Sequence, residues 1–241
     1  MSDKEKKVAV RTLALKKVYG SGNTEVIAMH DASMIVHYGE VVALLGPSGA
    51  GKSTFLTAVG LINPPTSGEV HIGGELVLKG SVPSTDLKKF RRKHIGFVFQ
   101  KSNLIPFLTA VENVQVALEI NGNSAAYAKK RAMQLLDELG MAERYDNYPA
   151  MLSGGQQQRV AVCRALANKP SLILADEPTA ALDSHLGRQV MELFRDIAHR
   201  HGTAVIVVTH DHRALDVFDA IYEMEDGVIT LNEKGHTGVT V

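Results

Sequence analysis

The feature that most constrains this chain is a glycine-rich segment between an apolar run and a helical pattern. Residues 46–54 read Gly-Pro-Ser-Gly-Ala-Gly-Lys-Ser-Thr and fit the spacing G-x-x-x-x-G-K-[ST]. The segment follows residues 41–45, an apolar run typical of a buried parallel strand, and precedes residues 55–59, which can form a helix. A glycine-rich turn that matches by chance is the alternative, but strand and helix stand where a phosphate-binding loop needs them. The sequence therefore predicts an α/β fold built around a phosphate-binding loop.

The residue types in this loop suit phosphate chemistry. Its glycines allow a tight curl that turns backbone N–H groups inward, and the helix behind adds its positive N-terminal end. We expect Lys52 to reach the β- and γ-phosphates of a nucleotide and the Ser53 hydroxyl to bind Mg²⁺. The predicted phosphate-loop residues are Gly46, Pro47, Ser48, Gly49, Ala50, Gly51, Lys52, Ser53 and Thr54.

Two further apolar runs end in groups that can act on a phosphate. Residues 172–175 precede Asp176 and Glu177, and ligands of open α/β sheets bind at the carboxyl ends of strands. Asp176 suits a Mg²⁺ partner, and Glu177 is placed to orient or deprotonate an attacking water. Residues 205–208 lead to His210, whose imidazole can contact a γ-phosphate. The alternatives are two solvated acids and a surface histidine, the interpretation given to the other nine histidines.

The rest of the chain predicts two strand-rich regions around a helical block. Residues from about 110 to 167 show helical patterns, with one helix over residues 125–139 and another over residues 160–167. Asn123 or Ser124 would cap the first of these helices, and Gly140 would end it. The charged first seven residues and the last seven are expected to be mobile. The further strands are expected at residues 8–19, 26–36, 69–72, 75–78, 95–99 and 228–231.

Composition excludes several classes of protein. Lys plus Arg and Asp plus Glu both number 26, so the net charge is zero, which argues against a globally basic nucleic-acid binder and an acidic disordered chain. A single cysteine, Cys163, excludes an internal disulfide and any multi-cysteine metal site, and its apolar neighbours predict a buried, inert thiol. No apolar stretch approaches the roughly 18 residues of a membrane-spanning helix, so none is expected.

A second anion-binding pattern lies about 100 residues after the first. Residues 152–159 read Leu-Ser-Gly-Gly-Gln-Gln-Gln-Arg, in which Ser153 suits an N-cap and two glycines expose backbone N–H groups at a helix start. One nucleotide does not obviously need two such helix ends in one chain. Here the sequence resembles the ATP-binding cassette (ABC) ATPases, whose hallmark is LSGGQ. The motifs occur in that family's order: the phosphate loop, Gln100, residues 152–159, residues 172–178, Ala181-Leu182-Asp183 and His210.

The resemblance implies a fold and an assembly. The fold is α/β, a P-loop NTPase (RecA-like) core with an N-terminal antiparallel β subdomain and an inserted α-helical subdomain. Residues 1–241 would form one ABC ATPase domain, with the core at about 8–100 and 168–231 and the helical part at about 101–167. Two cassettes of this family face head to tail and trap two ATP molecules with Mg²⁺, so the LSGGQ segment would serve the partner's γ-phosphate. Its residues are Ser153, Gly154, Gly155 and Gln156.

The resemblance also implies roles for single residues. Glu177 matches the catalytic base and His210 the switch histidine. Gln100 matches the residue that contacts Mg²⁺ and water and reports to the membrane partner, and Asp183 lies in the loop between the two ATP sites. Tyr19 stands where the family places an aromatic ring on adenine; a core tyrosine at a strand end is the alternative.

Three kinds of ABC protein remain open from the residues. The first is a transporter subunit at the cytoplasmic face of the inner (plasma) membrane that powers a separate permease. The second is a soluble ATPase acting on DNA, although the coiled coils, zinc modules or second cassette usual there are missing and no nucleic acid is expected. The third is a regulatory cassette of the FtsE type that signals without transport.

Within transporters, the sequence is similar to the exporter group of LolD, MacB and DevA, and it most resembles the DevA type in residues 178–183 and 209–216. That group implies export of a lipid, lipoprotein or drug-like substrate, often with a membrane-fusion protein, and residues 103–113 would line the groove for the permease. The basic run at residues 88–93 could contact DNA or anionic lipid, or form a solvated helix face.

Overall fold

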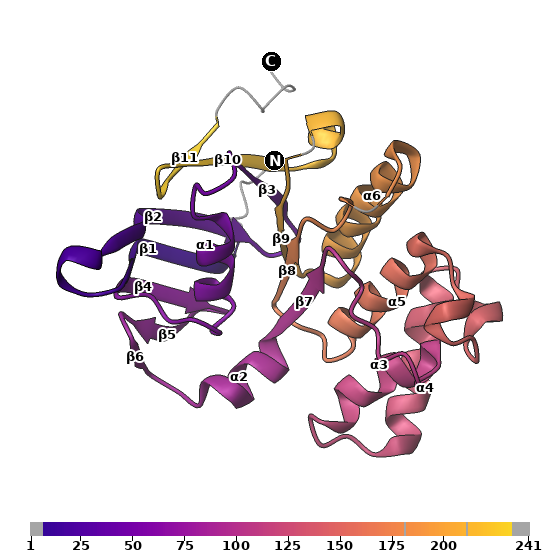
Figure 1. Ribbon diagram of the computed structural model, residues 1–241. Coiled ribbons are helices and arrows are strands. Elements are labelled where there is room, and N and C mark those ends of the chain that lie inside the picture. Colours follow the sequence, from indigo (N-terminus) through magenta and orange to yellow (C-terminus); the bar gives the residue numbers. More distant parts are fainter. Residues whose placement is uncertain (1–6, 181, 211, 233–241) are drawn as a thin grey trace, which may run out of the picture.

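Two sheets form the framework of the protein. The computed structural model describes residues 7–180, 182–210 and 212–232, so Ala181, Asp211 and the predicted mobile chain ends lie outside the described residues, apart from Lys7. The first sheet is antiparallel, five-stranded and ordered β2-β1-β4-β5-β6 (Figure 1). Its strands are β1 (Val8–Tyr19), β2 (Val26–His37), β4 (Ser67–Ile72), β5 (Glu75–Lys79) and β6 (Val82–Pro83).

The second sheet has six strands in the order β11-β10-β3-β9-β8-β7. Neighbouring strands run parallel from β7 to β10, and only β11 pairs antiparallel, at the edge. All carboxyl ends of the parallel strands therefore meet at one edge of the sheet, where ligands of such sheets bind. The strands are β3 (Val41–Leu45), β7 (Ile95–Phe99), β8 (Leu172–Asp176), β9 (Ala204–Val208), β10 (Ala220–Glu225) and β11 (Val228–Leu231).

The helices begin where the sequence offers a cap. Ser124 and Ser153 cap their helices as predicted, and Asp86, Thr109 and Asp183 do the same elsewhere, each accepting a bond from a backbone N–H of the first turn. The α-helices are α1 (Lys52–Val59), α2 (Leu87–His94), α3 (Ala110–Glu119), α4 (Ala125–Glu138), α5 (Gly154–Leu166) and α6 (Ser184–His201). The 3₁₀ helices are η1 (Gly22–Thr24), η2 (Ala142–Arg144), η3 (Pro149–Met151) and η4 (His212–Val217).

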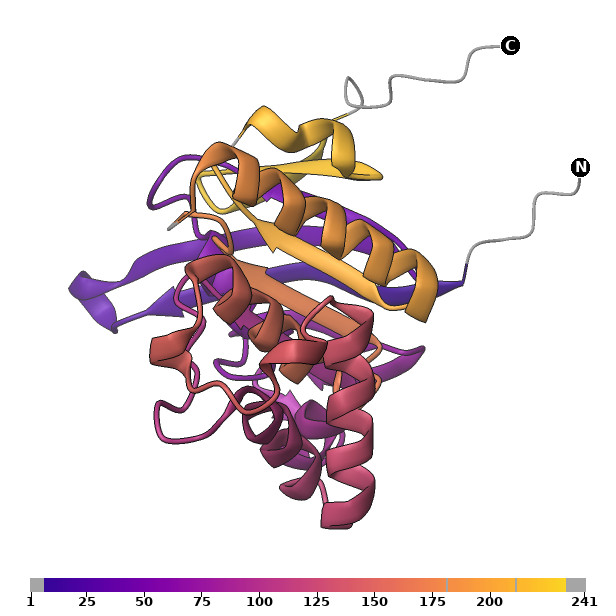
Figure 2. The ribbon, with the colours of Figure 1, turned by 90° about the vertical axis from the view of Figure 1, so that its right-hand side faces the viewer.

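Both faces of the six-stranded sheet are buried. In β3, Val41, Ala43 and Leu45 face a core shared with α3, α4, α5 and α6, whereas Val42 and Leu44 face a second core shared with α1 and the antiparallel sheet. Because side chains of a strand alternate between faces, a strand covered on both sides is apolar throughout. Figure 2 shows α5 and α6 lying across one face of the sheet.

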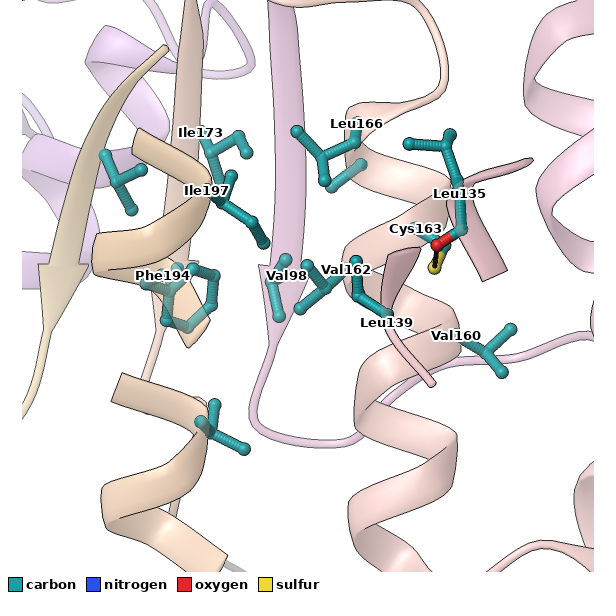
Figure 3. Close-up of a cluster of buried hydrophobic side chains, with 14 of the residues drawn as sticks. Val98, Leu135, Leu139, Val160, Val162, Cys163, Leu166, Ile173, Phe194 and Ile197 are labelled. Carbon is teal, nitrogen blue, oxygen red and sulfur yellow. Dashed lines mark hydrogen bonds between the residues drawn. The ribbon is translucent and has the colours of Figure 1, made fainter. Parts of the chain in front are cut away.

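The core under α5 and α6 contains the single cysteine (Figure 3). Phe194 of α6 and Val98 of β7 lie in this core, and Cys163 of α5 lies deeper in the helical side. The Cys163 thiol donates to the carbonyl of Leu135, 3.3 Å away, and burial raises its pKa far above the ordinary value. The prediction that Cys163 is buried is confirmed, and its inertness stays a prediction.

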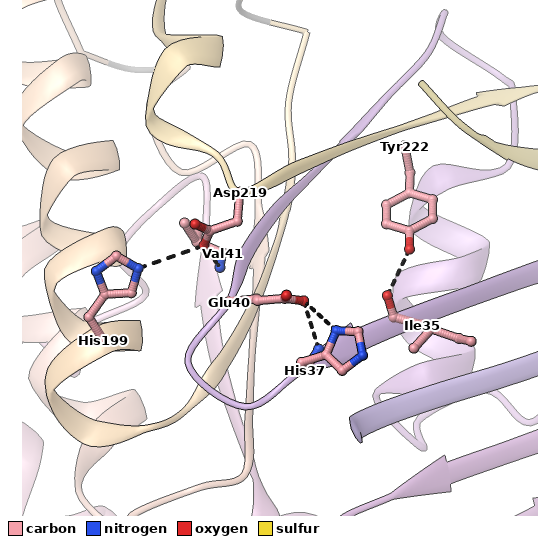
Figure 4. A network of polar contacts seen from close by, with 7 residues as sticks. All are labelled: Ile35, His37, Glu40, Val41, His199, Asp219 and Tyr222. Carbon is pink, nitrogen blue, oxygen red and sulfur yellow. Dashed lines mark hydrogen bonds and ion pairs between the residues drawn. The ribbon is translucent and has the colours of Figure 1, made fainter. Parts of the chain in front are cut away.

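The opposite edge of the sheet is held by polar contacts (Figure 4). The Asp219 carboxylate accepts from the backbone N–H of Val41 at 2.8 Å, and His199 lies 3.8 Å from the same oxygen. The Tyr222 hydroxyl donates to the carbonyl of Ile35 at 2.7 Å, which ties β10 to β2 of the other sheet. These contacts fix the start of β3, so the loop that follows this strand has a rigid base.

Three elements go beyond the sequence-based expectation. The sequence reasoning left out β6, β10 and α6, although α6 carries the signals of a helix: the Asp183 cap, buried Val190, Phe194 and Ile197 at helical spacing, and Gly202 after its last turn. Helices α1 and α5 also begin earlier than expected: α1 starts at Lys52, directly after Gly51, and α5 includes Gly154 and Gly155 in its first turn.

The basic run of residues 88–93 belongs to α2 and forms a solvated helix face. Phe90 is buried, while Lys88, Lys89, Arg92 and Lys93 are exposed. The run is thus an exposed basic helix face, and contact of this face with DNA or anionic lipid stays a prediction.

Candidate active site

The phosphate loop runs from β3 into α1, and two of its glycines are required by close contacts. A Cβ atom on Gly46 would lie 2.1 Å from the carbonyl oxygen of Met224, and one on Gly51 would lie 2.4 Å from that of Ala28. Both residues also have positive φ, 147° and 102°. Gly49 has φ 86° but open space around it. The loop is thus pressed against β2 and β10, two contacts that the motif alone did not predict.

Lys52 begins α1 and points back into the loop. Its Nζ donates to the carbonyl oxygens of Gly46 at 2.6 Å and Pro47 at 2.8 Å. The ammonium group is therefore held at the mouth of the loop, beside the N-terminal end of α1.

Two neighbouring strands bring an acid and a histidine together. Asp176 ends β8 opposite Val208 of β9, and the backbone N–H of Glu177 donates to the carbonyl of Val208 at 2.9 Å. The Glu177 carboxylate lies 2.8 Å from Nδ1 of His210. Glu177 has φ 48°, a left-handed conformation that costs a non-glycine residue about 1–3 kcal/mol and is concentrated at functional sites.

Burial sets the charge state of Asp176. Desolvation raises the pKa of this half-buried carboxyl above the usual aspartate value, the negative charge of Glu177 adds to the rise, and Lys52 opposes it. A cation bound between these groups would reverse the effect.

The loop, the acids and the histidine share one cavity of about 530 Å³. Ala28 of β2 and Val208 also line it; sequence reasoning missed both, because neither carries a motif and only the folding of β2 over the loop places Ala28 there. The lining residues are Ala28, Gly46, Ser48, Gly49, Gly51, Lys52, Ser53, Thr54, Asp176, Glu177, Val208 and His210.

The LSGGQ segment lies outside this cavity. Ser153 caps α5 through a reciprocal pair of bonds with Gln156, at 3.3 and 2.9 Å. Ser153, Gly155 and Gln156 line a separate cavity of about 540 Å³ between α4, α5 and α6. Asp183 is the N-cap of α6, where its carboxylate accepts from two backbone N–H groups at 3.0 Å.

Two other predicted residues stand apart from the phosphate cavity. Gln100 is exposed just after β7 and does not line it. Tyr19 is 42% exposed at the end of β1, so it is not a core residue. Its hydroxyl accepts from Nδ2 of Asn63 at 2.7 Å, and Nζ of Lys17 lies 5.3 Å from its ring centroid.

A groove of about 430 Å³ runs beside β7, the edge strand. Phe99 and Ile120 contribute to its apolar part, and Arg91, Arg92 and Arg164 also line it. Each guanidinium donates to a backbone carbonyl, and the residues that line the groove include no aspartate or glutamate. The groove therefore presents positive charge that its own lining does not neutralise.

A residue outside the predicted set links two parts of the site. Gln158, buried in α5, donates from Nε2 to the carbonyl of Phe99 at 3.2 Å, so the LSGGQ helix is tied to the strand end before Gln100. The run of three glutamines was visible in the sequence, but its contact was not.

Among the described residues, no helix has the length and apolar character needed to cross a bilayer.

Comparisons with known proteins agree with this geometry. Residues 29–180 match the protein family described as ABC transporter. The lipoprotein-releasing system ATP-binding protein LolD of Zymomonas mobilis is 44% identical over 213 residues, 88% of this chain and 91% of that protein. The macrolide export ATP-binding/permease protein MacB of Agrobacterium fabrum is 40% identical over 225 residues, 93% of this chain but only 34% of MacB.

A solved structure is also similar. The cassette MJ0796 of Methanocaldococcus jannaschii, a dimer in a post-hydrolysis state bound to ADP and Pi, has a TM-score of 0.80 and 41% identity, covering 92% of this chain and 97% of that one. The chain therefore belongs to the ABC transporter family, as an ATP-binding subunit with ATPase activity and the P-loop NTPase fold.

Proposed function

We propose that this chain hydrolyses ATP as a head-to-tail homodimer and powers a separate membrane permease. The observation that carries the proposal is the division of the site. The phosphate loop, Asp176, Glu177 and His210 share one cavity, whereas Ser153 and its neighbours line another. A second copy that presents its LSGGQ helix to the phosphate cavity would complete the site, and MJ0796 has been solved as a dimer.

The phosphate cavity supplies the groups that hydrolysis needs. Backbone N–H groups of the loop and Lys52 hold the phosphates once Lys52 exchanges its contacts with Gly46 and Pro47 for phosphate oxygens. Glu177 takes a proton from the water that attacks the γ-phosphorus, as the bond to the ADP oxygen breaks. His210, in contact with Glu177, orients that carboxylate and reaches the γ-phosphate.

The residues present fit Mg²⁺. Ser53 and Asp176 line the same cavity and offer hydroxyl and carboxylate oxygens, the ligand type that Mg²⁺ prefers alongside water and phosphate. Burial and the charge of Glu177 raise the pKa of Asp176, so a bound cation would stabilise the charged form of this carboxyl. When bound, Mg²⁺ would neutralise charge on the β- and γ-phosphates. Gln100 would join this site only through a movement of the segment after β7.

The remaining residues contact the rest of the nucleotide. Ser153, Gly154, Gly155 and Gln156 would bind the partner's γ-phosphate through the N-terminal end of α5. Tyr19, with its ring exposed at the tip of β1, would stack on adenine. Asp183, at the start of α6, would lie between the two ATP sites of the dimer.

The groove beside β7 is the proposed contact with the permease. Asn103 lines it, in the segment 103–113 that was expected there, and its three arginines favour a permease segment that carries acidic residues. Such a contact would hold the chain at the cytoplasmic face of the inner (plasma) membrane. LolD and MacB act on lipoproteins and macrolides, so we propose export of a lipid, lipoprotein or drug-like substrate, with a membrane-fusion protein as a further partner. The similarity to DevA stays a prediction.

Glu177→Gln tests the proposed chemistry. The variant should bind ATP, hydrolyse it at least about 100-fold more slowly, since general-base catalysis contributes that much, and accumulate as an ATP-bound dimer. Steady-state phosphate release and sedimentation with and without ATP measure these outcomes. Glu75→Gln, exposed at the start of β5 and lining neither cavity, is the control and should stay near the wild-type rate. Normal turnover in Glu177→Gln would exclude the role of Glu177.

A further inference from the structure

An arginine on α6 forms an ion pair with the segment that follows His210. Nη1 and Nη2 of Arg188 donate to the two carboxylate oxygens of Asp216 in η4, at 3.1 and 2.6 Å. Nε of Arg188 donates to Glu192, one turn further along α6, at 3.0 Å. A planar guanidinium paired with a carboxylate at two points fixes orientation as well as distance.

The Arg188–Asp216 pair connects two segments that each begin at a residue of the phosphate cavity. Glu177 leads through a short loop into α6, and His210 leads into η4, so Arg188–Asp216 joins the two segments that leave the two site residues. Beneath the pair, Val217 of η4 and Val190 of α6 are buried in the same core. The two segments are thus joined at two places: by the Glu177–His210 contact of 2.8 Å where they begin, and by the Arg188–Asp216 pair and this core further along.

His210 needs such support, because its own side chain is 71% exposed. A side chain with so little packing around it keeps its direction mainly through the backbone that carries it. We propose that Arg188 is a positioning residue: by holding Asp216, which follows a kink at the buried Ala214 of η4, it fixes the far end of the segment after His210 and so keeps His210 against Glu177. The inference rests on the roles proposed above for Glu177 and His210.

The test compares Arg188→Gln, Asp216→Asn and the double variant with wild type. Each should lower kcat about two- to fivefold, the range for an exposed but well-aligned ion pair, and leave KM for ATP unchanged. The double variant should fall no further than either single one, and Arg188→Lys, which can reach only one oxygen, should be intermediate. Arg200→Gln breaks another exposed pair of α6, with Asp196, that does not involve η4, and should leave kcat unchanged.

A spectroscopic readout separates positioning from general stability. The ¹⁵N resonance of His210 Nδ1, assigned by its loss in His210→Gln, should move toward the value of a free imidazole in Arg188→Gln and stay in Arg200→Gln. An unchanged kcat, or a fall in kcat with the resonance unmoved and the melting temperature lowered, would overturn the proposal. Wild-type turnover in His210→Gln itself would instead overturn the role of His210 in the proposed function.

Discussion

Asp176 shows how burial at a strand end sets the chemistry of one carboxyl. Its pKa is raised by desolvation and by Glu177, so the folded protein disfavours the charged form. A carboxyl whose pKa is higher in the folded than in the unfolded state adds stability below about pH 4, and that stability is lost as pH rises through the folded pKa. Without a cation, the site therefore costs folding free energy at neutral pH.

Asp176→Asn should raise the free energy of unfolding at pH 7, and the gain should shrink as pH falls toward 3. Urea unfolding across this pH range measures it. Asp86→Asn is a control of opposite sign: backbone N–H groups of Lys89 and Lys88 lower the pKa of Asp86, so its contribution is present above about pH 4 and is lost as pH falls. Equal pH profiles for Asp176→Asn and wild type would show that burial does not shift this carboxyl.

The loop glycines make a second comparison at the residue scale. Gly51→Ala places a Cβ 2.4 Å from the carbonyl of Ala28, whereas Gly49→Ala meets nothing within 4 Å, although both residues have positive φ. Gly49→Ala should lower the free energy of unfolding by about 1 kcal/mol, which is the conformational cost alone. Gly51→Ala should lower it clearly more and should also weaken ATP binding. Thermal unfolding and equilibrium ATP binding measure both. Equal costs would mean that β2 does not press on the loop.

At the scale of elements, α4 and α5 both begin with a serine N-cap, but the two helix starts have different roles. Ser124 accepts from the N–H of Tyr127 and Ser153 from that of Gln156, at 3.4 and 3.3 Å. The start of α4 lines neither cavity, whereas the start of α5 lines the one between α4, α5 and α6. The same local rule thus begins an ordinary helix and a proposed anion site.

Ser124→Ala and Ser153→Ala should therefore each cost about 1 kcal/mol of stability. Only Ser153→Ala should also lower ATPase activity, because its hydroxyl is proposed to meet the partner's γ-phosphate. Chemical unfolding and phosphate release, measured over a range of protein concentrations, distinguish the two effects. A similar ATPase rate in both variants would leave Ser153 as a cap and nothing more.

At the scale of the whole molecule, two cores share one sheet. Alternate residues of β3, β8 and β9 enter opposite cores, so we expect the two cores to unfold cooperatively. The site lies at the edge where the strands of this sheet end, so its geometry depends on both cores.

Phe194→Ala removes a side chain with no exposed surface between α6 and the sheet and should cost about 3–5 kcal/mol. Phe107→Ala is the matched control: its ring is 77% exposed, so the change should stay within about 0.5 kcal/mol. Denaturant midpoints compare them. A small cost for Phe194→Ala would contradict the packing of α6 on the sheet.

The sequence by itself determined the features that depend on local chemistry. The phosphate loop, Asp176 and Glu177 at the end of β8, the serine caps of α4 and α5 and most strands follow from turn residues, caps and apolar periodicity, which act over a few neighbours. The continuous apolar run of Val41–Leu45 also indicated a buried parallel strand. By contrast, β6 has only two residues and a weak signal in the sequence, and β10 was missed although it has six.

Only the tertiary structure decided which of these residues meet. The contact of Glu177 with His210, the close approach of Ala28 and Met224 to the loop, and the ion pair of Arg188 with Asp216 join residues at least 23 positions apart in the chain. It also placed Ser153 in a cavity apart from Lys52. The physical reason is that spacing along a chain fixes periodicity and turns, whereas strand order and the packing of helices on a sheet fix which strand ends become neighbours.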